Sequence, residues 1–285
     1  IGYVTVYNLP PVADAGGPYT GEAGVPILLS AAASFDPGPA DLLTYHWDWE
    51  SDGVIDVVTN VVTVTHTWDG TGVYIVTLRV TDGDGGEDTD TARVTVDPAD
   101  LVRIEIAPTA AAVTAGDTQS YTVTAFDALD NAWDATDVAV YAIETSAGGS
   151  WTANSYVSEK AGAWVVTATY GAAMDTATLT VASGTLDHVA LTPAEVRIVA
   201  GEYMTYTVSA FDAHGNFIAD VTASSVFSHP VEAGGSWTGD VYTSEHVRDW
   251  IITAIHQDIS ADALLHIAAK APEQFLFLPL VQREE

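Results

Sequence analysis

The residues best suited to chemistry lie in the stretch DWESDGVID, at positions 48–56. Asp48, Glu50 and Asp52 place oxygen side chains at alternate positions, Gly53 follows them, and Asp56 adds a fourth carboxylate. This spacing allows a loop to wrap a hard cation, and Ca²⁺ takes about six to eight oxygen ligands in irregular geometry. Two interpretations stay open: a calcium site made by the four carboxylates, or a solvated acidic hairpin loop.

The stretch resembles the D-x-D-x-D-G calcium loops, with Glu50 at the middle position and no glutamate at the far end. A second acidic run, DGDGGEDTD at 82–90, lies between two expected strands. Its three glycines favour a flexible hairpin turn, and the alternative is a metal contribution from Asp82 or Asp84. Residues 10–98 hold 15 acidic and 2 basic residues. Crowded carboxylates repel one another unless they bind cations or protons.

Catalytic motifs are absent from the sequence. The chain has no cysteine, which excludes thiol catalysis and disulfides, and it contains no G-x-S-x-G, HExxH, P-loop or dinucleotide-binding pattern. Acidic pairs occur throughout, so no particular pair indicates a glycosidase. We therefore expect no enzymatic activity.

The charge balance restricts the partners. Eight basic residues against 39 acidic ones give a formal net charge of −31. Nucleic-acid affinity comes from Lys and Arg at phosphates, so nucleic acid is not expected as a partner. No apolar run is long enough to cross a bilayer, and we expect no membrane insertion. The chain begins at Ile1 and not at methionine, which suggests a processed or excised sequence.

An internal duplication organises the chain. YTVTAFDALDN at 121–131 returns as YTVSAFDAHGN at 206–216, and AGGSWT at 147–152 returns at 233–238. The offsets are 85 and 86 positions. A period this long, with its own strand and turn signals, indicates duplicated domains and not a short solenoid repeat.

Short alternating runs separated by turns predict antiparallel sandwiches. Before the duplication these runs are 26–30, 43–49, 61–66, 72–81 and 89–96. The expected fold is all-β, a tandem array of three immunoglobulin-like β-sandwiches. The expected domains are 10–98, 99–182 and 183–268, flanked by an N-terminal strand or linker at 1–9 and a tail with a short apolar strand at 269–285.

Two family resemblances accompany this pattern. Residues 9–98 resemble the PKD (polycystic kidney disease) domain through LPPVADAG, SFDP, LTYHWDW, THTW and GVYIVTLRVTD, in that order. The two repeats resemble bacterial immunoglobulin-like domains of the invasin/intimin type through TAGD or VAGE followed by YTV-x-AFDA-x-x-N. These resemblances imply a bacterial cell-surface or extracellular protein.

The tryptophans are expected to be structural. Trp151 and Trp164 recur as Trp237 and Trp250, which fits core packing better than stacking on sugars. In the first domain, Trp47 and Trp49 flank Asp48 on one expected strand, where one residue faces the core and its neighbour does not. His66 is expected to be a packed side chain and not a metal ligand.

The expected function is a non-catalytic structural or adhesive segment: a stalk, an adhesin or a filament subunit. Its partner is then a protein, including another copy of the chain, or a surface glycan. Apolar strands at the two ends, marked by Val4 and Val6 and by Phe275 and Phe277, leave two alternatives open. Either they drive head-to-tail assembly by strand donation, or they fold back on their own domains or fray in solution. The alternatives are an accessory region of a secreted hydrolase that acts on a polymer, and a carbohydrate-binding protein.

Overall fold

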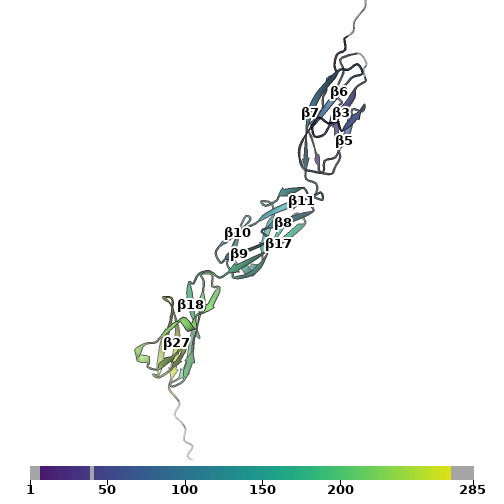
Figure 1. Cartoon of the computed structure of the whole chain (residues 1–285). Helices are drawn as coiled ribbons and strands as arrows, with labels where there is room; N and C mark the ends of the chain where they lie inside the picture. Colours follow the sequence, from purple (N-terminus) through teal and green to yellow (C-terminus); the bar gives the residue numbers. More distant parts are fainter. Residues whose placement is uncertain (1–6, 39–41, 271–285) are drawn as a thin grey trace, which may run out of the picture. The chain divides into compact units, whose positions relative to one another are not determined.

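The computed structural model describes residues 7–38 and 42–270. Within these ranges the chain forms strands β1 to β27 and three single-turn 3₁₀ helices, and no α-helix (Figure 1). The strands form three successive sandwiches, β1–β7, β8–β17 and β18–β27. The predicted all-β tandem array is therefore confirmed. No helix in these ranges has the length and apolar character needed to span a membrane.

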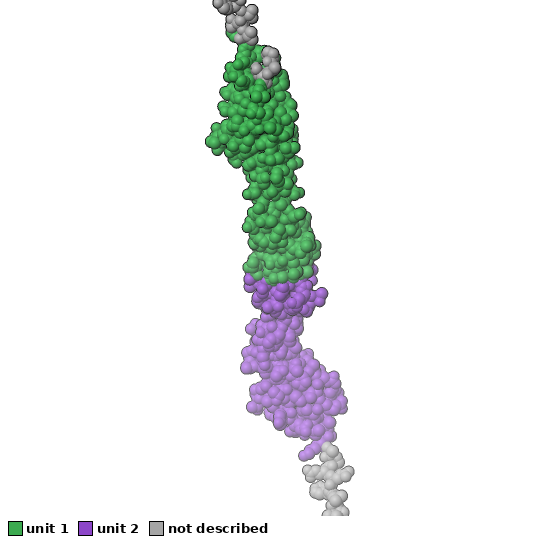
Figure 2. Space-filling view, turned by 90° about the vertical axis from the view of Figure 1, so that its right-hand side faces the viewer, with its two compact units in different colours: residues 1–109, 121–142, 167–177 green, residues 110–120, 143–166, 178–285 purple. Residues whose placement is uncertain are grey.

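The chain divides into two compact units, which we describe separately (Figure 2). The first contains residues 1–109, 121–142 and 167–177, and the second contains residues 110–120, 143–166 and 178–285. The division passes through the second sandwich. Each segment that links two consecutive sandwiches therefore lies inside one unit.

The first sandwich pairs a five-stranded sheet, in the order β1-β7-β6-β3-β4, with the two-stranded sheet β2-β5. All five alternating runs that the sequence indicates are strands. Two further strands, β1 and β4, complete the larger sheet. The bounds are β1 (Tyr19–Glu22), β2 (Ile27–Ser30), β3 (Thr44–Asp48), β4 (Val57–Thr59), β5 (Thr63–His66), β6 (Gly72–Thr81) and β7 (Glu87–Asp97).

Aromatic side chains stack on one another in the core of this sandwich, among alanine, leucine, isoleucine and valine. Trp47 is fully buried and stacks on Trp49, with ring centroids 5.8 Å apart. Trp49 in turn stacks on His66 at 4.7 Å, and Trp68 meets His66 edge-on at 4.4 Å. The packed role expected for His66 agrees with this geometry. The expected in–out alternation around Asp48 is wrong, because Trp47, Asp48 and Trp49 are all buried where β3 ends.

Carboxylates of the second acidic run hold the segment that precedes β1. Asp88 and Asp90 on β7 accept the backbone N–H groups of Ala13 and Ala15 at 2.9 and 2.8 Å. In the β6–β7 turn, Asp82 accepts the side-chain amide of Asn8 at 2.8 Å. Carboxylate side chains therefore accept backbone hydrogen bonds here that the carbonyl groups of a neighbouring strand would otherwise accept. Val4 and Val6 lie outside the described residues.

The second and third sandwiches share one arrangement of strands. Each has a three-stranded sheet (β12-β11-β8 or β18-β21-β22), a four-stranded sheet (β13-β16-β17-β9 or β19-β27-β26-β23) and a small three-stranded sheet (β10-β15-β14 or β20-β25-β24). The bounds in the second are β8 (Arg103–Ala107), β9 (Ala110–Thr114), β10 (Thr118–Ser120), β11 (Thr122–Phe126), β12 (Ala132–Asp134), β13 (Val140–Ile143), β14 (Ser150–Thr152), β15 (Ser155–Val157), β16 (Gly162–Tyr170) and β17 (Ala173–Ala182).

The third sandwich repeats these elements. Its bounds are β18 (His188–Thr192), β19 (Glu195–Val199), β20 (Tyr203–Thr205), β21 (Thr207–Phe211), β22 (Phe217–Asp220), β23 (Val226–Ser228), β24 (Ser236–Thr238), β25 (Val241–Thr243), β26 (Arg248–His256) and β27 (Ile259–Ala268). The 3₁₀ turns are η1 (Thr145–Ala147), η2 (Thr222–Ser224) and η3 (Val231–Ala233). The tail with Phe275 and Phe277 lies outside the described residues.

The recurring tryptophans make equivalent contacts in the two repeats. The indole N–H of Trp164 donates to the carbonyl of Lys160 at 2.8 Å, and that of Trp250 donates to the carbonyl of His246 at 2.9 Å. Trp151 and Trp237 each pack on a tyrosine with ring centroids 5.1 Å apart. These tryptophans therefore pack inside their own sandwich, as the recurrence predicts.

An early strand pairs in parallel with the last strand of every sandwich. The pairs are β1 with β7, β9 with β17 and β19 with β27. The two strands of a parallel pair run in the same direction. The early strand therefore begins near one end of the sandwich, and the last strand finishes near the opposite end.

Candidate metal centre

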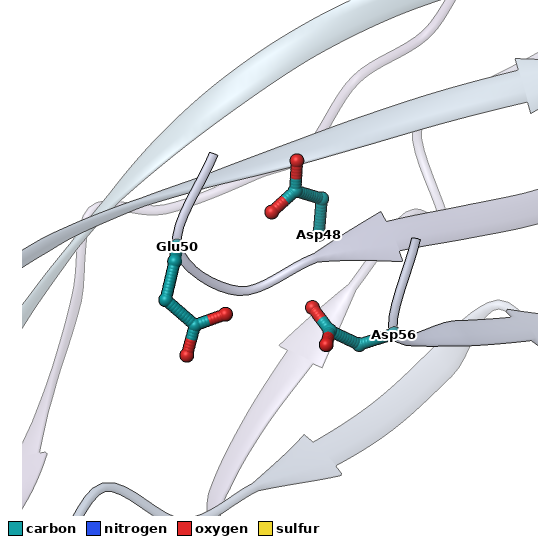
Figure 3. Close-up of side chains that lie close together, drawn as sticks. All are labelled: Asp48, Glu50 and Asp56. Atoms are coloured by element: carbon teal, nitrogen blue, oxygen red, sulfur yellow. The ribbon is translucent and has the colours of Figure 1, made fainter. Parts of the chain in front are cut away.

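Three of the four predicted carboxylates meet at one place. Asp48 stands at the end of β3, and Glu50 and Asp56 belong to the loop that leads to β4. One carboxylate oxygen from each residue lies within 4.8 Å of the others (Figure 3). Asp48 is buried, whereas Glu50 and Asp56 are exposed. The group therefore has one buried member and two members that face solvent.

Backbone hydrogen bonds hold this loop in place. The two oxygens of Asp48 accept the N–H groups of Asp52 and Gly53, at 3.2 and 2.8 Å. Asp56 accepts the N–H of Trp49 at 2.8 Å. Gly53 has φ +89°, a left-handed conformation that glycine adopts without steric cost. Asp48 and Asp56 therefore shape the loop whether or not an ion is bound.

Glu50 and Asp52 differ from these two residues. Within residues 7–38 and 42–270, Glu50 takes part in no hydrogen bond or ion pair, so its carboxylate is available to a ligand. Asp52 is exposed and its Oδ1 accepts the N–H of Val54 at 2.8 Å, which forms a local turn. The structure thus brings Asp48, Glu50 and Asp56 together and leaves Asp52 outside the group.

The second predicted group is a turn. Oδ1 of Asp82 accepts the N–H groups of Asp84 and Gly86 at 2.9 and 2.8 Å, and its other oxygen accepts Asn8. The Asn8 amide is the largest influence on the carboxyl of Asp82 and lowers its pKa. Both oxygens of Asp82 thus have protein donors, and Asp84 is exposed in the turn.

The electrostatics favour a cation at the first group. Burial against the tryptophans lowers the pKa of His66, and the nearby Glu50 and Asp56 only oppose this shift. The imidazole is therefore not a standing positive charge beside the carboxylates. None of the ion pairs in the described part of the chain includes Asp48, Glu50 or Asp56. A hard cation could use these three oxygens together with water or backbone carbonyls to reach six or more ligands.

A second set of polar residues was not recognised from the sequence as a site. Asp127 and Asn131, and their equivalents Asp212 and Asn216, stand at the two ends of the DA-x-x-N part of the repeated motif. Both aspartates and Asn216 are buried. The sequence did contain an indication of this set: the Asp and the Asn are the same in both repeats, whereas Leu129-Asp130 between them is replaced by His214-Gly215. Their contacts reach neighbouring sandwiches and are described below.

Comparison with known protein families assigns one segment of the chain to a family. Residues 8–96 match the family model of the PKD domain, which confirms the predicted PKD domain; the match covers less than half of the chain. No curated protein matches the chain.

Solved structures with similar folds include several tandem β-sandwich proteins. The adhesin FdeC of Escherichia coli is 18% identical, with 90% of this chain and 98% of that chain covered and a TM-score of 0.43. The PKD domain of an M14-like peptidase from a Thermoplasmatales archaeon is 29% identical, with 33% of this chain and 100% of that chain covered and a TM-score of 0.27. Mouse cadherin-23 EC22–24 is 14% identical, with 92% of this chain and 99% of that chain covered and a TM-score of 0.44.

Proposed function

We propose that this chain, with a PKD domain at residues 8–96 and two immunoglobulin-like repeats after it, is a non-catalytic spacer segment of a bacterial extracellular or cell-surface protein. The observation that supports this most is the parallel pairing of an early strand with the last strand in all three sandwiches. The domain boundaries expected at 98/99 and 182/183 are part of the proposal.

Parallel pairing determines how tension acts on each sandwich. A force along the chain pulls the early strand and the last strand in opposite directions along their common axis. The hydrogen bonds between them are then loaded together and must break together. Four residue pairs join β1 to β7, and five pairs join the corresponding strands in each repeat. Such an arrangement suits a segment that holds other parts of a protein at a distance under load.

The charge also fits an exposed spacer. A net charge of −31 opposes aggregation between copies in solution. The same segment would also be adhesive if one of its sandwiches binds a protein or a surface glycan. Assembly of copies through the end strands is one form of this adhesive role. The alternative is a spacer inside a secreted hydrolase, between its catalytic domain and a polymeric substrate.

Stretching single molecules of the whole chain by its termini tests the spacer role. We expect three separate unfolding events. Each should release one sandwich of about 85–90 residues and lengthen the molecule by roughly 250 Å, because an extended residue spans about 3.3–3.6 Å. A chain that extends smoothly, without discrete events, would contradict the proposal. Two events would contradict the proposed boundaries.

We further propose that Asp48, Glu50 and Asp56 bind Ca²⁺ in this spacer. The observation that favours calcium is the convergence of three carboxylates without a neighbouring positive charge. An ion at the end of β3 would link this strand to the start of β4. Binding only to the folded state would then stabilise the first sandwich.

Hydrogen exchange of residues 44–59 in the full chain tests calcium binding. At about 100 times its dissociation constant, Ca²⁺ should stabilise the bound state by about 2.7 kcal/mol and slow exchange that requires opening by about a hundredfold, relative to EDTA. Glu50→Gln should abolish the effect without disturbing the loop, because Glu50 makes none of the hydrogen bonds that shape it. Glu22→Gln, an exposed change in the same sandwich, is the control. Equal exchange of the unmodified chain in Ca²⁺ and in EDTA would contradict the site.

A further inference from the structure

The repeated motif ends in the same hydrogen-bonded turn in both repeats. We call the segments 127–131 and 212–216 the docking turns. In each, one carboxylate oxygen of the aspartate accepts the N–H groups two and four residues further on, and the other accepts the asparagine side-chain amide. All these distances are 2.8–2.9 Å. The aspartate is buried in both turns.

The same aspartates also hold the segments that link the sandwiches. The second oxygen of Asp127 accepts the N–H of Ala99 at 3.1 Å, and that of Asp212 accepts the N–H of Gly184 at 2.7 Å. Burial alone would raise the pKa of Asp212, but the donors from Gly184, Asn216 and His214 outweigh burial and lower it to about 2. The carboxylate is therefore charged at neutral pH, and hydrogen bonds to a charged acceptor are stronger than neutral ones.

The asparagines reach the preceding sandwich. The amide of Asn131 donates to the carbonyl of Asp69 at 2.7 Å, and its oxygen accepts the N–H of Thr71 at 3.2 Å. The amide of Asn216 donates to the carbonyl of Glu159 at 2.8 Å, and its oxygen accepts the N–H of Ala161 at 2.9 Å. A side-chain amide offers a donor and an acceptor together. It therefore pairs with the backbone as another peptide group would.

The receiving loops, 69–71 and 159–161, occupy equivalent places. Each directly precedes the first residue of a long strand, Gly72 of β6 or Gly162 of β16. Their sequences, Asp-Gly-Thr and Glu-Lys-Ala, have no residue in common. The asparagine bonds nevertheless match, because they go only to the backbone.

We propose that the Asp-x-x-x-Asn docking turn is an inter-domain connector that binds the backbone of the receiving loop in the preceding sandwich, and so joins an immunoglobulin-like repeat to a PKD domain or to another repeat. Asn131 and Asn216 are the positioning residues of this connector. The inference does not depend on the spacer role, because it concerns only how neighbouring sandwiches are held.

The third sandwich supplies an internal reference. Its equivalent loop is 245–247, directly before Arg248 of β26. Within residues 7–38 and 42–270, the carbonyl of Glu245 and the N–H of Val247 have no hydrogen-bond partner, and Val247 is exposed. Val247 therefore reports how fast this backbone position exchanges without a docking turn.

Amide hydrogen exchange in the full chain tests the connector. In the unmodified chain, the N–H groups of Thr71 and Ala161 should exchange at least about tenfold more slowly than that of Val247. Asn216→Ala should speed exchange at Ala161 by roughly tenfold, the value of one hydrogen bond of about 1–1.5 kcal/mol. Thr71 should be unaffected. Asn131→Ala should have the opposite pattern, with faster exchange at Thr71 and no change at Ala161.

Asn60→Ala is the matched control, because the Asn60 amide also makes two hydrogen bonds, to Leu43 and Thr44, but within the first sandwich. It should change neither Thr71 nor Ala161. Slow exchange of the β26–β27 amides in Asn216→Ala verifies that the third sandwich stays folded. The proposal is overturned if Ala161 exchanges as fast as Val247 in the unmodified chain. It is equally overturned if Asn216→Ala changes exchange only inside the turn and leaves Ala161 as it was.

Discussion

Replacing Trp47 by alanine is expected to lower the free energy of unfolding of the first sandwich by about 3–5 kcal/mol, the usual cost of deleting a large buried aromatic side chain. Trp47 is fully buried and stacks on Trp49 at the centre of the core. The substitution would leave a cavity between the two sheets. Exchange of the β6–β7 amides during denaturant titration of the full chain measures the loss.

Trp133 provides the matched control. It is half-buried on β12, and the second repeat has Ile218 at the equivalent position. Trp133→Ala should lower the free energy of unfolding of the second sandwich by about 1 kcal/mol, the usual size of the loss for a single substitution. If Trp47→Ala were equally mild and instead reduced binding to glycans, tryptophan stacking on sugars would replace the structural interpretation.

Periodicity was sufficient to predict the long elements of the fold. The alternating runs at 43–49 and 72–81 became β3 and β6, and the 85-residue offset predicted two repeats with one arrangement of strands. The sequence did not indicate β1 or β4. These strands have four and three residues, so they offer too few positions for a period of two to be visible.

The candidate metal centre could be predicted in part. The alternate spacing predicted that Asp48 and Glu50 lie near each other, as they do. Asp56 lies beside them because its carboxylate accepts the N–H of Trp49. Asp52 could not be assigned from spacing alone. The direction in which the Asp52 side chain points depends on the left-handed backbone conformation of Gly53 and on the N–H groups that Asp48 accepts.

Other acidic residues were beyond the reach of sequence patterns. Asp88 and Asp90 each accept an N–H from a residue 75 positions earlier, and a contact at that separation leaves no local signature. Asp127 and Asp212 resemble ordinary turn residues in the sequence, since aspartate favours turns. Only the fold reveals that each also binds the linker and that its partner asparagine reaches the preceding sandwich.

We expect an early strand and the last strand of each sandwich to resist tension together, and pulling the third sandwich in two different directions tests this expectation. The chain has no cysteine, so two introduced cysteines define the points of attachment. In one variant, Ala194→Cys with Lys270→Cys, force enters directly ahead of β19 and leaves after β27, and it loads the β19–β27 bonds together. In the other, Arg248→Cys with Lys270→Cys, force separates β26 from β27 at their Arg248–Ile267 end, one pair at a time.

The folded domain is the same in both variants, and only the loading differs. The first attachment should require several times the rupture force of the second at the same pulling speed. Equal rupture forces in the two directions would contradict it.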